Sequence, residues 1–386
     1  MDNIAGSKST LQWAVQLSVI ALVLLWLFPT VGLLVSSFRT ADQIATSGWW
    51  KAMFPSEQNL VIRAADPDDE GVQVQDGDLW VIEGNLFALD GRSAAELSVW
   101  GTSSREIAAY QAGDTADLGD GESLTVMANG DYRLTAPEQM TGRGQRVFLT
   151  AVAPPEFTLA NYHSMLLDPN NSEGMARAFF NTLTVTIPAT VIPILIAAFA
   201  AYALAWMDFP GRAILIAIVV GLLVVPLQLA LIPLLKFHNN IGIGKGYLGV
   251  WLAHTGFGLP LAIYLLRNYM AGLPRDIIEN AKVDGASDFQ IFTKIILPLS
   301  FPALASFAIF QFLWTWNDLL VAKVFLIDAS GETTVMTNKI VELLGTRGGN
   351  WEILATAAFV SIAMPLAVFF AMQRYLVRGL LAGSVK

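Results

Sequence analysis

The chain has 386 residues, of which 54% are Ala, Val, Ile, Leu, Met, Phe, Trp, Tyr or Cys and only 14% are charged. A typical soluble protein carries about 25% charged residues, so this composition excludes an ordinary soluble globule and a disordered chain. The net charge of −9 argues against a nucleic-acid partner. Cysteine is absent, which excludes disulfides, thiolate metal sites and a cysteine nucleophile. We therefore interpret the chain as a membrane protein.

The charges are unevenly distributed along the chain. Residues 39–178 contain 21 Asp and Glu against 9 Lys and Arg, whereas the remaining residues contain 11 against 14. An acidic, soluble segment therefore interrupts a sparsely charged chain whose connections are basic.

Six stretches are free of formal charge and reach the roughly 20 residues that a helix needs to cross a hydrocarbon core of about 30 Å. They are residues 9–38, 178–207, 213–235, 246–266, 295–317 and 353–373. The first could be a signal peptide, but it is longer than such an apolar core and no small-residue cleavage site closes it. We expect it to remain as a helix.

The short connections predict the orientation, because Lys and Arg accumulate on the cytoplasmic side of a membrane. Most of these residues follow the second, fourth and sixth spans: Arg212, Arg267, Arg275, Lys282, Lys294, Arg374, Arg378 and Lys386. Lys236 and Lys245 on the opposite side weaken this bias without reversing it. Both termini are therefore expected in the cytoplasm, and the acidic segment outside.

Between about residues 57 and 153 the pattern changes to short runs rich in Val, Leu, Thr and aromatic residues, separated by Asp-Gly and Asn-Gly pairs. Such runs predict a small antiparallel β domain. Asn129-Gly130 predicts a hairpin with a type I′ turn, and residues 146–153 predict a closing strand. The acidic stretch 114–122 is either a calcium loop or a solvated turn, and it lacks the EF-hand spacing.

Catalytic and metal-binding motifs are not found. His163, His238 and His254 lie far apart without an H-E-x-x-H motif, and residues 242–246 lack the frame of a phosphate loop. No catalytic residue, metal site or cofactor is predicted for this chain. If the protein moves a solute uphill, the energy comes from an ion gradient or from another subunit. Because the spans carry almost no charge, we favour another subunit.

The connection over residues 267–300 is the most informative one. Pro274 suits the start of a helix and Gly285 the position just past a helix end. Ser287 with Gln290 forms a capping box that starts a second helix, with Phe289, Phe292 and Ile296 on one side. Two short amphipathic helices joined at a glycine are either a docking element or a bland interfacial loop, and periodicity does not separate these alternatives.

The residues themselves carry a resemblance. Glu279 to Ala286, read as Glu-Asn-Ala-Lys-Val-Asp-Gly-Ala and followed by Leu297-Pro298-Leu299, resembles the EAA signature of binding-protein-dependent ABC importer permeases. Asn280 stands where that family usually has alanine. Trp316-Asn317-Asp318 and the run 373–386 are similar to the second permease of maltose-type carbohydrate importers. The insert resembles, more weakly, that of the α-glucoside permeases.

Together these features predict an all-α polytopic membrane protein with six transmembrane helices and an inserted, extracytoplasmic β-rich domain. The expected parts are the N-terminus with the first helix (1–38), an external loop (39–177) holding the β-rich domain at about 57–153, and a five-helix core (178–386). The resemblance implies a bacterial inner-membrane location and a non-enzymatic role. The implied partners are a second homologous permease, a cytoplasmic ATPase dimer that holds ATP and Mg²⁺, an extracytoplasmic sugar-binding protein and membrane lipid.

The resemblance also assigns residues to ATPase coupling. In the loop these are Glu279, Ala281, Asp284, Gly285, Ala286, Leu297 and Pro298. In the C-terminal tail they are Gly383, Ser384, Val385 and Lys386.

Gln311, Trp314, Thr315 and Asp318 share one face of the fifth span, because they stand at positions i, i+3, i+4 and i+7. Gln311 lies about 15 Å from the inner end of this span, near the midplane. An aromatic ring beside amide, hydroxyl and carboxylate groups suits a sugar, which favours a translocation path. The alternatives are bonding between helices, an interfacial tryptophan, and sugar contacts made mainly by the partner permease.

Two further functions stay open at this point. A membrane sensor would bring a cytoplasmic signalling domain or a long coiled coil, and an ion-coupled secondary transporter would bring inverted repeats. Neither feature is evident in the chain.

Overall fold

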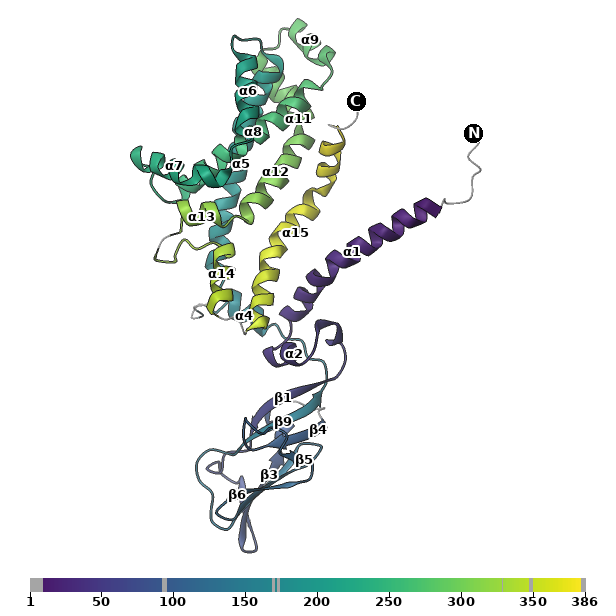
Figure 1. The fold of residues 1–386 in the computed structure, drawn as a ribbon, viewed down its shortest axis with the longest axis vertical. Helices are drawn as coiled ribbons and strands as arrows, with labels where there is room; N and C mark the ends of the chain where they lie inside the picture. The colour runs from purple at the N-terminus through teal and green to yellow at the C-terminus, as the bar shows by residue number, and fades with distance from the viewer. Residues whose placement is uncertain are drawn as a thin grey trace. The chain divides into compact units, whose positions relative to one another are not determined.

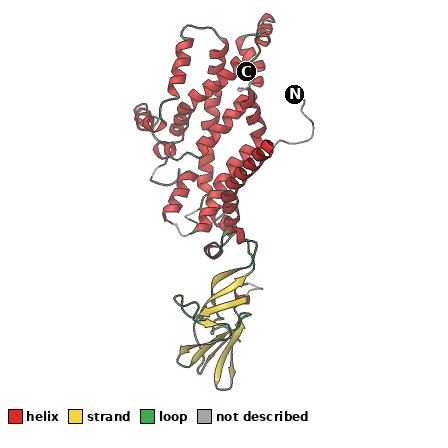
Figure 2. Ribbon diagram, turned by 45° about the vertical axis from the view of Figure 1, so that its right-hand side comes forward, coloured by secondary structure: helices red, strands yellow, loops and turns green. Residues whose placement is uncertain are grey.

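The structure is a computed structural model that describes residues 10–91, 96–168, 171, 174–327, 329–346 and 350–382. Its contacts divide the chain into two compact units. The first comprises Met1–Tyr162 and Gly349–Thr356, and the second His163–Gly348 and Ala357–Lys386. Among the described residues, strands occur only in the first unit, whereas the second is helical (Figure 2).

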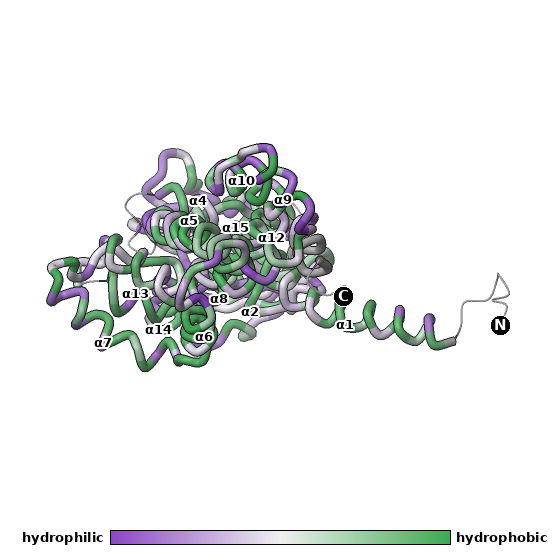
Figure 3. The backbone as a smooth tube through the Cα atoms, turned by 90° about the horizontal axis from the view of Figure 1, so that it is seen from above, coloured by the Kyte–Doolittle hydropathy of each residue, from purple (hydrophilic) through white to green (hydrophobic). Residues whose placement is uncertain are grey.

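The first unit opens with α1 (Thr10–Ser37), a helix without a formal charge. Hydrophobic colours dominate α1, with a few hydrophilic positions toward its N-terminal end (Figure 3). Only 6% of its most apolar eighteen-residue stretch is buried within this chain. A helix that is apolar on all sides and is not buried in its own protein suits a lipid environment.

The β domain (residues 56–153) contains two antiparallel sheets, with strand orders β1-β9-β4-β5 and β2-β3-β8-β7-β6. The strands are β1 (Ser56–Arg63), β2 (Gln73–Asp76), β3 (Leu79–Asn85), β4 (Glu96–Gly101), β5 (Tyr110–Gln111), β6 (Thr115–Gly119), β7 (Glu122–Val126), β8 (Asp131–Ala136) and β9 (Arg146–Ala153), and a short helix α3 (Leu86–Leu89) follows β3. The predicted closing strand is present as β9. It pairs with β1 from Ser56–Ala153 to Arg63–Arg146, so the first and last strands leave the domain side by side.

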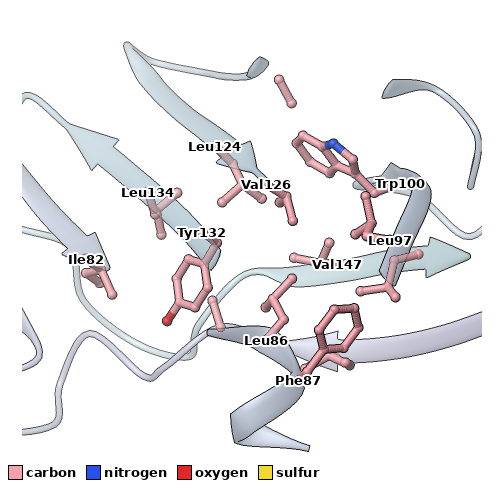
Figure 4. Packing of buried hydrophobic residues seen from close by; sticks show 14 of the residues in the cluster. Ile82, Leu86, Phe87, Leu97, Trp100, Leu124, Val126, Tyr132, Leu134 and Val147 are labelled. Carbon is pink, nitrogen blue, oxygen red and sulfur yellow. The ribbon is translucent and has the colours of Figure 1, made fainter. Parts of the chain in front are cut away.

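The core of the β domain lies between the inner faces of its two sheets. Every second residue of β1 is buried, which is the alternation of a strand with one face on a core. Trp100 is fully buried, donates its indole N–H to the carbonyl of Gln111 (3.0 Å) and packs 4.9 Å from the ring of Tyr110. Trp100 belongs to one buried cluster with the aliphatic side chains of Leu97, Leu124, Val126, Leu134 and Val147 (Figure 4). Both aromatic rings therefore belong to the packing of the core.

The hairpin between β7 and β8 is confirmed, but the predicted type I′ turn is wrong. Gly130 has φ +84°, whereas Asn129 has no positive φ, and a type I′ turn requires positive φ at both positions. The carbonyl of Met127 instead accepts from the N–H of Gly130 (2.9 Å), closing a longer loop.

The side-chain amides of Asn85 (2.8 Å) and Asn129 (2.7 Å) donate to the carboxylate of Asp131 at the start of β8, and these hydrogen bonds lower the pKa of its carboxyl.

The acidic stretch 114–122 forms the β6–β7 hairpin. Gly119, Asp120 and Gly121 all adopt positive φ in its tight turn. Among the described residues, no three His, Asp or Glu side chains gather as metal ligands.

The two ends of the insert meet at the C-terminal end of α1. The N–H of Thr158 donates to the carbonyl of Phe38 (2.8 Å), and the amide of Asn161 donates to the carbonyls of Ser37 (3.0 Å) and Arg39 (2.9 Å). The last carbonyls of a helix have no partner within the helix. Residues that return from the β domain therefore satisfy the end of α1.

The N-terminal part of α15 reaches the same place. The buried hydroxyl of Thr356 donates to the carbonyl of Ser37 at 3.3 Å. The start of α15 and both ends of the insert consequently lie at one end of α1.

The second unit is a helical bundle. Its helices are α5 (Ala176–Trp206), α6 (Arg212–Leu222), α7 (Leu227–Asn240), α8 (Tyr247–Ala271), α9 (Arg275–Val283), α10 (Asp288–Ile291), α11 (Leu297–Leu299), α12 (Phe301–Trp316), α13 (Leu320–Phe325) and α14 (Met336–Thr346), and α4 (Ala160–Leu166) and α15 (Trp351–Ala382) join it to the first unit. α5 and α8 run alongside each other (Figure 1). Buried alanines at their contact, Ala197, Ala201 and Ala262, let the two backbones approach closely.

Four described helices are long and apolar enough to cross a membrane: α1, α5, α8 and α15. The number rises to six if each of two bent helix pairs is one span. The predicted span over residues 213–235 is broken, because α6 and α7 meet at 110°. Pro226 stands at this break and has no N–H to continue the first helix. The predicted span 295–317 is likewise bent by 69° where α12 begins at Phe301, next to Pro302.

Candidate functional site

The connection between α8 and α12 is a corner of two short helices, α9 and α10. Gly285 lies between them with φ +81°. Its N–H donates to the carbonyl of Lys282 (3.0 Å), and the N–H of Ala286 donates to the carbonyl of Ala281 (3.0 Å). These two bonds are a Schellman motif, which requires a left-handed residue just past the helix end. Glycine adopts this conformation without steric cost.

The predicted capping box at the start of α10 is confirmed. The hydroxyl of Ser287 accepts from the N–H of Gln290 (3.3 Å), and the side-chain oxygen of Gln290 accepts from the N–H of Ser287 (2.9 Å). α10 then continues into a π-helical segment, η2 (Phe292–Ile296), and into α11. The α9–α10 corner is therefore closed on both sides by local hydrogen bonds.

The inner side of the corner packs on α5 and α8. Ile278, Ile291 and Ile296 are buried in one cluster with residues of both helices. The ring of Phe292 lies 4.7 Å from Phe199 and 5.3 Å from Tyr202 of α5. The hydroxyl of Tyr202 also donates to Asp288 at 3.3 Å. A displacement of the corner consequently acts directly on α5.

The coupling residues inferred from the resemblance fall on two sides of this corner. Glu279, Asp284, Gly285 and Pro298 are exposed, whereas Ala281, Ala286 and Leu297 are half-buried against the bundle. The tail residues Gly383, Ser384, Val385 and Lys386 lie outside the described residues.

Two large apolar side chains on the outer side were not predicted there. Val283 is 86% exposed and Phe289 is 65% exposed. The sequence interpretation that put Phe289 on the same side as Phe292 and Ile296 is wrong, since the latter two are buried. The ring of Phe292 contacts Phe199 and Tyr202 of α5, whereas Phe289 lies outside that contact.

On α12, the side chain of Gln311 is a helix contact. It is 2% exposed and donates to the carbonyl of Ala189 on α5 (3.1 Å). It also packs against Gly258 of α8, where an added Cβ would lie 2.7 Å from the side-chain oxygen of Gln311. Gln311 thus joins three helices.

Asp318 and Trp314 meet around a histidine. The carboxylate of Asp318 caps α13 by accepting from the N–H groups of Val321 (3.2 Å) and Ala322 (3.0 Å). One of its oxygens is 3.6 Å from Nε2 of His254 on α8, and the ring of Trp314 lies edge-on to this histidine at 6.2 Å. His254 is fully buried.

Sequence reasoning missed His254. It was set aside because the three histidines are far apart in the chain, although a lone histidine within an otherwise charge-free span was a usable signal.

Several buried polar groups of the bundle have no hydrogen-bond partner within the described part of the chain, although Nε2 of His254 lies 3.6 Å from Asp318. Both ring nitrogens of His254 belong to this set, as do hydroxyls on three helices: Thr186 and Thr190 of α5, Thr255 of α8 and Thr315 of α12. Buried polar groups are nearly always paired in folded proteins.

Comparison with known proteins shows the family. A profile described as "Binding-protein-dependent transport system inner membrane component" matches residues 174–381. These residues contain α5 to α15 and hence both the α9–α10 corner and α12. The chain belongs to this family of inner-membrane transport components.

Individual relatives match this chain as well, one of them beyond the residues that the family profile covers. The chain is 62% identical over 385 residues to the alpha-glucoside transport system permease protein AglG of Rhizobium meliloti (strain 1021), covering 98% of each chain. It is 57% identical over 240 residues to the osmoprotective compounds uptake permease protein GgtD of Synechocystis sp., covering 62% of this chain and 79% of the relative. A chain from the crystal structure of a bacterial ABC transporter involved in alginate import matches with TM-score 0.47 and 23% identity, covering 58% of this chain and 81% of that chain.

The family membership confirms the resemblance and decides among the functions left open. The protein is a permease component of a binding-protein-dependent ABC importer in the bacterial inner membrane. A sensor or an ion-coupled transporter is not supported.

Gly285 provides a test of the corner. Gly285→Val forces a side chain into the left-handed region at a cost of about 1–2 kcal/mol, while nothing lies within 4 Å of its new Cβ. We expect normal membrane insertion, reduced transport and reduced recovery of the ATPase. Gly285→Asn is the matched control, because asparagine tolerates positive φ better, and it should keep more transport. Full transport by Gly285→Val would contradict the role of this turn.

Gly258 provides a test of the Gln311 contact. Gly258→Ala should displace the side chain of Gln311 and lower stability by about 1–3 kcal/mol, measured as thermal unfolding in detergent. Gly256→Ala on the same helix should be near neutral, because its Cβ meets nothing within 4 Å. The double variant Gly258→Ala, Gln311→Ala should cost less in total than the sum of the two single changes. Additive costs would show that the two residues do not interact.

Proposed function

We propose that this chain is one of two permease subunits of an ATP-driven importer of α-glucosides. One observation carries this proposal: the 62% identity to AglG extends over 98% of both chains, and so it includes the insert that the family profile at 174–381 does not reach. A relative that shares both the core and the insert is a better guide to substrate than one that shares the core alone.

Osmoprotective compounds are the second candidate substrate class. The 57% identity to GgtD is nearly as high as that to AglG, but it extends over only 62% of this chain. If the core alone selects the substrate, this relative has nearly equal weight.

The α9–α10 corner is the proposed site of coupling to a cytoplasmic ATPase that holds ATP and Mg²⁺. Val283 and Phe289 are large, apolar and exposed, and such side chains mark an interaction surface. Glu279 and Asp284 place carboxylates beside them. Leu297 and Pro298 connect the corner to α12, so movement imposed on the corner reaches both α5 and α12.

The proposed substrate path runs past His254, Trp314, Thr315 and Asp318. Trp314 is 39% exposed and offers a ring face, while the unpaired hydroxyl of Thr315 and the imidazole of His254 offer hydrogen bonds. A sugar has apolar ring faces and hydroxyl edges, which these groups complement. Gln311 supports the path by holding α5, α8 and α12 together. The partner permease would supply the other half of the path.

The proposed topology has six membrane-crossing segments, with both termini cytoplasmic and the β domain outside. The bent pairs α6–α7 and α10–α12 count as one segment each. The bonds of Ser37 to Asn161 and Thr356 support placing the insert and the start of α15 on one side. The β domain is a candidate docking element for the extracytoplasmic sugar-binding protein.

Uptake measurements test the substrate class. Cells that lack this subunit should lose uptake of labelled maltose, an α-linked glucose disaccharide, and regain it when the gene is restored. Uptake of cellobiose, its β-linked counterpart, is the matched control and should not change. Unaltered maltose uptake would contradict the α-glucoside proposal, and loss of osmoprotectant uptake alone would favour the second candidate.

Cysteine labelling tests the topology in a chain that contains no cysteine. Asp117→Cys on β6 should react with a membrane-impermeant maleimide in intact spheroplasts. Lys282→Cys on α9 and Asp208→Cys after α5 should react only after permeabilisation, since both are expected in the cytoplasm. Labelling of Asp117→Cys and Lys282→Cys from the same side would contradict the topology.

A further inference from the structure

The chain folds back along α1 immediately after this helix ends. α2 (Ala41–Thr46) reverses the direction, and η1 (Trp49–Lys51) then lies against α1. The ring of Trp49 meets Phe28 of α1 edge-on at 4.7 Å, and the ring of Trp50 stacks 6.4 Å from Phe28. Gly32 makes room for this contact, because a Cβ there would lie 2.7 Å from the indole nitrogen of Trp49. Trp49, Trp50, Met53 and Phe54 are called the aromatic wedge.

Buried polar groups hold the reversal in place. Arg39 is only 3% exposed, and its guanidinium donates to the carbonyls of Ser47 (3.0 Å) and Gln43 (2.5 Å) and to the hydroxyl of Ser47 (2.5 Å). The side chain of Gln43 in turn donates to the carbonyl of Glu156 at 3.2 Å. The position of the aromatic wedge is therefore built into this unit.

The outer side of the aromatic wedge is exposed and apolar. Trp50 is 61% exposed, Met53 72% and Phe54 66%. These side chains continue the surface of α1, on which Leu25 is 69% exposed. Clustered apolar side chains of this size need a partner.

The position of the aromatic wedge along α1 can be compared with the thickness of the hydrocarbon core of a membrane. Phe28 lies nine residues before Ser37, or about 13 Å from the helix end at 1.5 Å per residue. α1 has 28 residues and is about 42 Å long, which exceeds a hydrocarbon core of about 30 Å by roughly 12 Å. If the whole excess lies at this end of α1, the rings contact α1 at the boundary of the hydrocarbon core. If half of the excess lies at this end, they contact α1 about one turn inside that boundary.

We propose that the aromatic wedge is a membrane-interface anchor that sits at the boundary between lipid headgroups and acyl chains. Tryptophan is enriched at this boundary, because its ring is amphipathic. Lys51, among the exposed apolar side chains, can extend its charge toward lipid phosphates. A protein partner fits less well, since charged residues are depleted from the cores of protein interfaces.

The anchor has a consequence for the β domain. β1 begins at Ser56, two residues after Phe54. An interfacial aromatic wedge therefore sets the depth of α1 and keeps the first residue of the β domain at the membrane surface. This holds for a membrane permease of any substrate, so it does not depend on the α-glucoside proposal.

Spin-label accessibility tests the anchor. Met53→Cys is labelled with a nitroxide in the complete transporter, whose other subunits lack reactive cysteines, reconstituted in vesicles of phosphatidylethanolamine and phosphatidylglycerol. Collision rates with oxygen, which concentrates in lipid, and with a water-soluble nickel chelate report the depth. Two single-cysteine controls of similar exposure serve as references for the depth. They are Leu25→Cys on α1 and Val74→Cys on β2, whose native side chains are 69% and 64% exposed.

The label at Met53 should show an oxygen-to-nickel ratio several-fold above that at Val74 and below that at Leu25. Phe54→Cys provides a second labelled position should Met53→Cys fail to assemble. A ratio equal to that at Val74 would place the aromatic wedge in water. Low collision rates with both reagents would mean that another protein surface covers it. Either result overturns the proposal.

Discussion

The structure depends on one constraint, which is that a backbone N–H or C=O group buried in protein or facing lipid must find a hydrogen-bond partner. Each place where the helical ladder stops must therefore be satisfied by another part of the chain. At the end of α1, the amide of Asn161 takes up carbonyls that the helix leaves free. Near Pro226 and Pro302, the spans bend where the ladder is broken. The reversal after α1, pinned by the buried Arg39, obeys the same requirement.

The α9–α10 corner shows how local chemistry becomes mechanical coupling. Gly285 and Ser287 close the two ends of the turn without help from the bundle, so the corner has a defined shape of its own. Its buried isoleucines and Phe292 then attach that shape to α5 and α8. The exposed Val283 and Phe289 lie outside this attachment. The α9–α10 corner thus has one apolar side buried in the helical bundle and another exposed. Such a rigid element can transmit movement between the bundle and a partner protein.

Local features of the fold could be predicted because short-range interactions decide them. The alternation in β9, the glycine at position 285 and the capping box at Ser287 each depend on residues within a few positions of one another. Local pattern did not decide which side chains are buried or where an apolar stretch bends. Phe289 is exposed although Phe292 and Ile296, which the pattern puts on the same side, are buried, and the stretch 213–235 bends at Pro226.

By itself, the sequence determined that this is a polytopic membrane protein, where its apolar segments lie, that an acidic β domain interrupts them, and which permease family it resembles. Composition, local periodicity and short motifs are enough for these conclusions. Only the tertiary structure decided that Gln311 binds α5, that Asp318 and Trp314 meet at His254, and that Trp49 and Trp50 return to α1. Each of these contacts joins residues far apart in the chain, and their side chains meet only when the helices and turns between them are placed.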